Sequence, residues 1–194
     1  MRSLVALVAS SALFVACSST PAPVATADAG SSRTPARTVL SSQFGPGTEV
    51  GVNDASKCQV NMQDWATIGD SAHPVDDGQS QGGSMVSVSC TVKPDGDGFA
   101  VDASVSLAGQ GAVVLRGHFT PTGKQTNVYA AFTRGLVGNF QENDCTADYT
   151  AGAPMGVLAG RLWVTLTCPH LFAAQNARTC LGTAEIRLEN CAEK

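Results

Sequence analysis

Apolar and polar residues alternate with a period of two through much of the chain, and this pattern constrains the fold most. The segments 99–107, 113–119, 128–132 and 184–189 all show it. Such alternation is typical of β-strands with one face buried and one face in water. Turn-forming residues such as Pro, Gly and Asp fill 93–98, 109–111 and 121–124. We therefore predict three consecutive hairpins, a β-meander, from Met85 to Phe132.

The same pattern predicts an all-β fold, an antiparallel sandwich or flattened barrel of about seven or eight strands. Half-buried strands need a second apolar layer against which to pack, and a two-sheet core supplies it. Only 14% of the residues are charged, and Gly numbers 20, which also favours β structure. We expect one short helix or turn at 169–178, an irregular stretch at 61–70 with Trp65 plugging an edge of the core, and a polar loop at 70–83.

The N-terminus carries an export signal. Met1-Arg2-Ser3 is a positive start, and residues 4–15 are uncharged, a run too short to cross a bilayer as a helix. The stretch Leu13-Phe14-Val15-Ala16-Cys17 resembles the lipobox of bacterial lipoproteins, although Phe14 stands where that family usually has Leu. The resemblance implies cleavage after residue 16, acyl chains such as palmitate on Cys17 and, because Ser18 follows, transfer to the outer membrane. Two alternatives are an ordinary secretory signal with Cys17 as a free thiol, and a permanently inserted N-terminal helix.

A flexible tether follows the signal peptide (1–16). Residues 18–37 are mostly Ser, Thr, Pro, Ala and Gly, contain no aromatic residue, and cannot bury enough apolar area to fold. As a coil this segment would span about 25 Å. We therefore divide the chain into the signal peptide, a lipidated Cys17 with its tether (17–37), and a single β domain (38–194). An arm packed on the domain is the alternative for the tether.

Six further cysteines predict three disulfides in an exported domain: Cys58, Cys90, Cys145, Cys168, Cys180 and Cys191. The chain has no C-x-x-C, so a zinc ribbon or a thioredoxin-type redox site is not indicated. The strand phase places Cys90 and Cys168 on inward faces. The pairing that we favour is sequential, Cys58–Cys90, Cys145–Cys168 and Cys180–Cys191. A Cys90–Cys168 bridge between two sheets is the rival.

Motifs for catalysis and for cofactors are missing from the sequence. The net charge of −4 argues against a nucleic-acid partner. The three histidines form no H-E-x-x-H, and there is no G-x-S-x-G and no Walker loop. We predict no enzyme activity, no cofactor and no metal site. Asp95 and Asp97 lie in a loop that could be a weak calcium site or simply a turn.

Two aromatic residues could mark a binding surface. Trp163 and Tyr129 lie on the strand faces opposite their apolar neighbours, so we predict that both point outward. Alternatively, a second layer or the tether covers them.

These features together predict a lipid-anchored protein of the bacterial cell envelope, with a β domain that binds or scaffolds an unknown ligand or envelope partner. A first alternative is a carrier of a small apolar ligand in a barrel or inter-sheet pocket lined by residues such as Phe99, Val105 and Leu115. A second is an envelope hydrolase, which requires His118 or His170 beside a carboxylate and a hydroxyl in a cleft.

Overall fold

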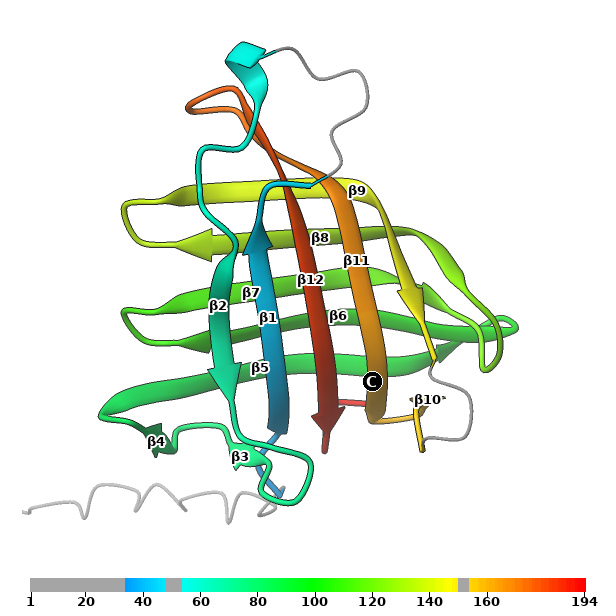
Figure 1. Ribbon diagram of the computed structural model, residues 1–194. Helices are drawn as coiled ribbons and strands as arrows, with labels where there is room; N and C mark the ends of the chain where they lie inside the picture. The colour runs from blue at the N-terminus through cyan, green and yellow to red at the C-terminus, as the bar shows by residue number, and fades with distance from the viewer. Residues whose placement is uncertain (1–33, 48–53, 150–153) are drawn as a thin grey trace, which may run out of the picture. The chain divides into compact units, whose positions relative to one another are not determined.

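The computed structural model describes residues 34–47, 54–149 and 154–194, and these fold almost entirely into antiparallel strands (Figure 1). The strands are β1 (Arg37–Gly45), β2 (Gln63–Ile68), β3 (Val75–Asp76), β4 (Ser80–Gln81), β5 (Ser84–Asp95), β6 (Gly98–Leu107), β7 (Gly111–Phe119), β8 (Gln125–Arg134), β9 (Gly138–Asp148), β10 (Gly156–Leu158), β11 (Arg161–Ala173) and β12 (Arg178–Glu189), with one 3-10 turn η1 (Asp54–Ser56). The all-β prediction is confirmed, with more strands than the seven or eight expected. No helix in the described part of the chain has the length and apolar character of a membrane span.

The strands form one antiparallel sheet that folds over on itself and nearly closes into a flattened barrel. Their order is β2-β1-β12-β11-β9-β8-β7-β6-β5-β4. In Figure 1, β2, β1, β12 and β11 form one layer, and β5 to β8 run nearly crosswise behind it. The predicted meander is confirmed, because β5, β6, β7 and β8 pair in sequence. The turn after β5 contains Gly96 with a positive φ of 59°, as a tight hairpin requires.

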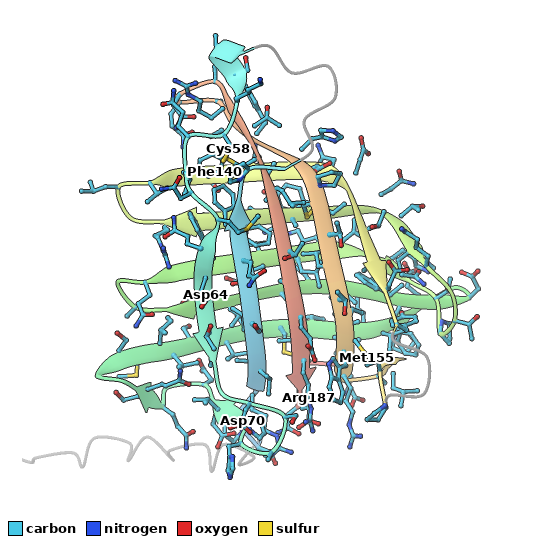
Figure 2. All side chains as sticks on the ribbon, viewed as in Figure 1. Cys58, Asp64, Asp70, Phe140, Met155 and Arg187 are labelled. Carbon is cyan, nitrogen blue, oxygen red and sulfur yellow. A yellow bond between two sulfur atoms is a disulfide. The ribbon has the colours of Figure 1, made fainter. Side chains whose placement is uncertain are left out.

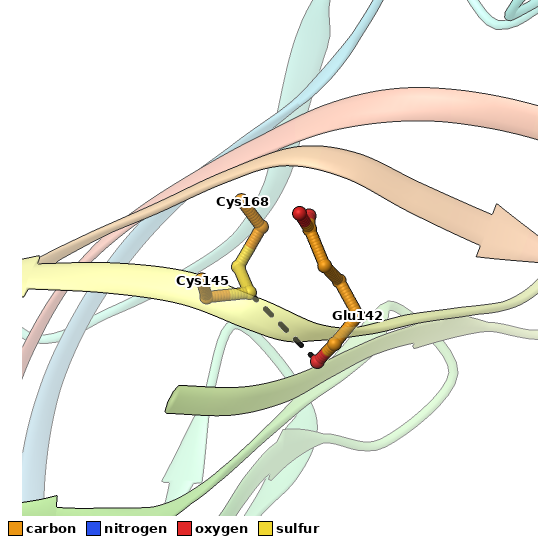
Figure 3. Close-up of side chains that lie close together, drawn as sticks. All are labelled: Glu142, Cys145 and Cys168. Atoms are coloured by element: carbon orange, nitrogen blue, oxygen red, sulfur yellow. Dashed lines mark hydrogen bonds between the residues drawn. A yellow bond between two sulfur atoms is a disulfide. The ribbon is translucent and has the colours of Figure 1, made fainter. Parts of the chain in front are cut away.

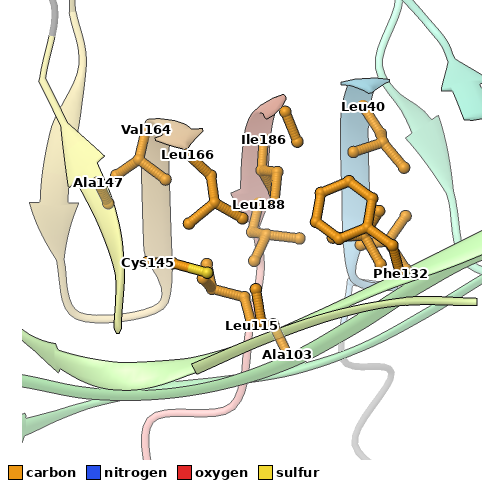
Figure 4. Packing of buried hydrophobic residues seen from close by; sticks show 14 of the residues in the cluster. Leu40, Ala103, Leu115, Phe132, Cys145, Ala147, Val164, Leu166, Ile186 and Leu188 are labelled. Atoms are coloured by element: carbon orange, nitrogen blue, oxygen red, sulfur yellow. The ribbon is translucent and has the colours of Figure 1, made fainter. Parts of the chain in front are cut away.

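The core lies between these two layers (Figure 4). Alternate residues of β11 and β12, such as Leu166 and Ile186, point at Leu115 and Phe132 of the other layer. All four side chains are at most 2% exposed. This explains the period-two pattern in the sequence, because the opposite face of each strand is left for polar residues.

Trp65 lies in the core, as predicted, but in a strand rather than in an irregular stretch. Its ring is fully buried, 4.4 Å from the centroid of Phe44, which in turn lies 4.6 Å from Phe140. The prediction of an irregular 61–70 segment is wrong because β2 does not alternate cleanly. The register between β1 and β2 shifts after Ser42, where the Ser42 hydroxyl donates to the Ala66 carbonyl.

Side chains cover the outer edge of β2. The Arg134 guanidinium donates to the backbone carbonyls of Asp64 (3.0 Å) and Trp65, and lies 4.8 Å from the Trp65 ring. Further along, Gln81 Nε2 donates to the Thr67 carbonyl at 2.9 Å. An edge strand with free carbonyls invites pairing with another chain, and these contacts occupy them.

The C-terminus covers the outer edge of β5. The Val92 N–H donates to the Ala192 carbonyl (2.8 Å), and the Ala192 N–H donates to the Cys90 carbonyl (2.9 Å). The Val92 carbonyl accepts from the Gly160 N–H at 2.9 Å. Near the start of β5, the Val88 N–H donates to the Asp77 carboxylate. This edge is therefore also covered.

All six predicted cysteines form disulfides, but two of the three favoured pairs are wrong. The bonds are Cys58–Cys180, Cys90–Cys191 and Cys145–Cys168, so only the last was predicted, and the rival Cys90–Cys168 bond is also wrong. Strand phase correctly predicted inward cysteines, but it carries no information about which distant strand lies opposite. The pairing of β12 with β1 brings Cys180 to Cys58. The path of the C-terminus along β5 brings Cys191 to Cys90.

Two local predictions also need correction. The segment 169–178, expected as a short helix or turn, instead continues β11 to Ala173, turns, and begins β12 at Arg178. A register shift between Cys168 and Leu171 accommodates Pro169, because proline lacks the N–H that a regular ladder needs. The polar loop 70–83 contains the short strands β3 and β4, which pair with β1 and β5.

Candidate functional site

A hollow of about 410 Å³ lies where β10, β11 and the end of β12 meet. This volume falls within the usual range of small-molecule sites, about 300–1,000 Å³. Most of its lining is apolar, with a few charged groups at the side: Pro121, Pro154, Met155, Gly156, Val157, Leu158, Arg161, Leu162, Trp163, Arg187, Leu188 and Glu189. Figure 2 labels Met155 and Arg187 at the same end of the domain.

The pairing of β10 with β11 places Trp163 in this hollow. Trp163 lies opposite Gly156 on one side and opposite Arg187 on the other. Gly156 has no side chain, and a methyl group built there would meet nothing within 4 Å. On the β12 side the Arg187 guanidinium lies 5.1 Å from the ring centroid, within cation–π range. The indole N–H donates to Glu185 at 3.0 Å, which fixes the ring orientation.

Glu189 holds two arginines at the back of the hollow. It accepts from Arg187 Nη2 at 2.7 Å and from Arg37 Nε at 2.6 Å. Burial disfavours its ionisation, but the hydrogen bonds from both guanidinium groups outweigh burial and lower the pKa of Glu189. Arg187 also donates to the Ser71 carbonyl at 3.0 Å. The charge and the donors of Arg187 are therefore largely satisfied within the protein.

Arg161 differs from Arg187. It is exposed and lies opposite Leu158 at the start of the β10–β11 hairpin. Its side chain makes no hydrogen bond or ion pair with the residues that the structure describes. Arg161 and Leu158 also border a second hollow of about 370 Å³, whose other lining residues are Ala159, Gly160, Asn190 and Glu193. Arg161 thus lies between an apolar hollow and a polar one.

Tyr129, the other aromatic residue predicted to face outward, lies on β8 away from this hollow. Its hydroxyl donates to Gln141 at 3.2 Å, and Arg116 lies 5.6 Å from its ring centroid. Both Tyr129 and Trp163 are half-buried on the outer face of the sheet, each beside an arginine. Only Trp163 lines the hollow described above. The structure therefore does not bring the two predicted residues together.

The three histidines lie beside acids in three separate places. His73 Nδ1 is 3.1 Å from Asp70, His118 Nε2 is 3.5 Å from Asp97, and His170 Nδ1 is 3.6 Å from Glu142. All three imidazoles are exposed, and none lines the hollow of Trp163. The carboxylate that the hydrolase alternative needs is present beside His118 and His170, but neither pair lies in that hollow.

Glu142 lies beside the Cys145–Cys168 disulfide (Figure 3). Its side chain is 8% exposed, and it accepts a hydrogen bond from the His170 N–H at 2.8 Å. Burial raises the pKa of Glu142, against the opposing effect of that hydrogen bond. Its carboxylate and the two sulfurs lie within 4.8 Å of one another. Because the sulfurs are bonded to each other, they offer no thiolate to a metal ion.

The sequence contains a local signal for much of the hollow. Residues 156–163 read Gly-Val-Leu-Ala-Gly-Arg-Leu-Trp, with a small two-residue turn between two short alternating runs. This pattern is typical of a tight hairpin, and it would have placed Leu158, Arg161 and Trp163 together. Met155, Arg187 and Glu189 come from other segments, and only the fold brings them to the site.

Cys17, the signal peptide and most of the tether lie outside the described residues, so the lipobox prediction stays a prediction. No protein-family model, no curated protein and no solved structure matches the chain.

Proposed function

We propose that this protein is a lipid-anchored component of the bacterial cell envelope, held through acyl chains on Cys17, most simply at the outer membrane. Its β domain binds a small molecule in the hollow of Trp163. It acts as a binding module rather than as an enzyme, and its ligand is not a nucleic acid. The anchor rests on the resemblance of residues 13–17 to the lipobox. Three disulfides support, though weakly, an oxidising compartment outside the cytoplasm.

The observation that carries the binding role is an apolar hollow with one oriented aromatic ring. Trp163 presents a half-buried indole, held by Glu185 and Arg187, beside Met155 and Leu158. A concave apolar lining with a few placed polar groups is the usual form of a small-molecule site. Leu158 is 62% exposed, so apolar area remains at the rim for a ligand to cover.

This proposal places the ligand on the outside of the barrel rather than inside it. The inter-sheet alternative needs room beside Val105 and Leu115, but both are at most 2% exposed and pack in the core. Filling that space would require the core to be rebuilt, which interiors tolerate poorly.

Binding of a neutral apolar dye, N-phenyl-1-naphthylamine, tests the role of the hollow. The protein for this test is the chain from residue 17 with Cys17→Ser, exported behind an ordinary secretory signal and purified without detergent. We expect saturable dye fluorescence that Trp163→Leu weakens at least 5-fold. Tyr129→Leu is the matched control, since it removes an outward aromatic residue beside another arginine, and it should change binding less than 2-fold. Equal effects of the two variants, or no saturable binding, would refute the site.

The anchor has a separate test. The intact mass of the native protein, extracted from its membrane, should correspond to a chain that begins at Cys17 and carries acyl groups. Alkylation should label the six other cysteines only after reduction. A chain with an unmodified Cys17 would contradict the lipoprotein assignment while leaving the hollow untouched.

A further inference from the structure

The two hollows beside the β10–β11 hairpin have different chemistry and share a border. Met155 and Trp163 line the apolar one, and Asn190 and Glu193 line the polar one. Leu158 and Arg161 line both. A ligand that spans the border would therefore need an apolar part and a polar part.

Four charged residues line the two hollows, Arg161, Arg187, Glu189 and Glu193, and Arg161 is the one that can hold an anionic polar part. Arg187 is already bound by Glu189 and by the Ser71 carbonyl. Arg161 is exposed and has no such partner among the described residues, so its five N–H donors remain available. A guanidinium pairs best with a planar anion such as a carboxylate, with two parallel hydrogen bonds.

The path of the chain places this border near the tether. The Asn190 amide donates to the Pro35 carbonyl at 3.0 Å, and Arg37 holds Glu189. Asn190 lines the polar hollow and Glu189 the apolar one. Both hollows therefore lie where the chain from Cys17 enters the domain.

We infer that the ligand is a single-chain amphiphile with an anionic head, such as a fatty acid. Its acyl chain packs on Trp163, Met155 and Leu158, and its carboxylate pairs with Arg161 at the border of the polar hollow. This inference rests on the proposed binding function and names the class of ligand for that same site. Under the proposed anchor the protein is held at a membrane, and membranes contain and release such molecules.

Two probes of equal chain length, decanoate and decan-1-ol, separate the contributions of head and chain. Their affinities are measured by isothermal titration calorimetry on the detergent-free Cys17→Ser chain, below the micellar concentration of decanoate. We expect Arg161→Gln to weaken decanoate about 10-fold and to change decan-1-ol less than 2-fold. Arg116→Gln, which removes another exposed arginine, on β7, should leave both affinities unchanged. Trp163→Leu should weaken both probes.

The outcomes distinguish this inference from the proposed function. If both probes bind through Trp163 but Arg161→Gln leaves decanoate unchanged, the anionic head is refuted and the binding role stands. If Arg116→Gln weakens decanoate as much as Arg161→Gln does, the effect is one of net charge, and the inference fails. If neither probe binds the parent chain, the amphiphile is refuted, and the neutral dye decides whether the hollow binds anything.

Discussion

Removal of the Cys90–Cys191 disulfide should destabilise the protein more than removal of the Cys145–Cys168 disulfide. The first bond joins residues 101 positions apart, and the second joins residues 23 apart. In the chain-entropy model these loops correspond to about 4.7 and 3.4 kcal/mol. All four cysteines are at least nine-tenths buried, so replacement of each pair by alanine loses similar packing, and that loss cancels in the comparison. We therefore expect C90A/C191A to cost about 1.3 kcal/mol more than C145A/C168A.

Urea unfolding at equilibrium, followed by tryptophan fluorescence, measures both free energies. The position of the first bond adds a local readout. The Val92 amide donates to Ala192, and Cys191 holds that residue against β5. Hydrogen exchange at Val92 should therefore accelerate in C90A/C191A and stay slow in C145A/C168A. An equal or reversed order of the two free energies would refute the entropic reasoning. Unchanged exchange at Val92 would refute the role of the bond in covering the edge of β5.

Three further predictions concern single residues. Arg134→Gln removes the guanidinium from the β2 carbonyls. It should lower the free energy of urea unfolding by about 2 kcal/mol and cause concentration-dependent association that light scattering detects. A monomer of parent stability would contradict the role of Arg134 in covering the edge of β2. Gly182→Ala places a methyl group against Leu171 and should cost roughly 1–3 kcal/mol; a neutral effect would show that the core yields there. Burial raises the pKa of Glu142, so the folded state binds more protons at this carboxyl than the unfolded state does. The free energy of unfolding therefore falls as the pH rises from the ordinary pKa of 4.5 through the raised pKa. Glu142→Gln should flatten that slope and retain an acceptor for the His170 N–H, whereas an unchanged slope would assign it to another group.

The parts of the fold that the sequence predicts are those where local pattern and final environment agree. In β5, β6 and β7 the strands alternate regularly, β8 pairs with β7 without a register shift, and each turn has its own Gly or Pro, so the meander is determined locally. The sequence does not predict β2 or the end of β11 as strands. A register shift interrupts the alternation of β2 in its pairing with β1 and that of β11 in its pairing with β12. The segment 169–178 shows little alternation in its sequence, which predicts a short helix or turn, but the buried Leu171 and Ala173 maintain the strand period.

The candidate site was predictable only in part, for a related reason. Outward exposure of Trp163 follows from the phase of one strand, which is local information. Its contact with Arg187 depends on the register between β11 and β12, and the position of Glu189 beside Arg37 depends on the pairing of β1 with β12. The prediction of the disulfide pairs was wrong for the same reason, because Cys58 and Cys90 bond to cysteines more than 100 residues away, and local pattern carries no information about such distant partners.

The pairing of β1 with β12 also sets the order of events during biosynthesis. β1 is the first strand of the domain and β12 the last, so the layer that contains both cannot assemble until nearly the whole chain has been synthesised. Until Cys180 and Cys191 emerge, Cys58 and Cys90 have no native partner. A chain that ends before residue 180 would keep two unpaired thiols and an open sheet edge. The native disulfides Cys58–Cys180 and Cys90–Cys191 therefore form only after the C-terminus is complete.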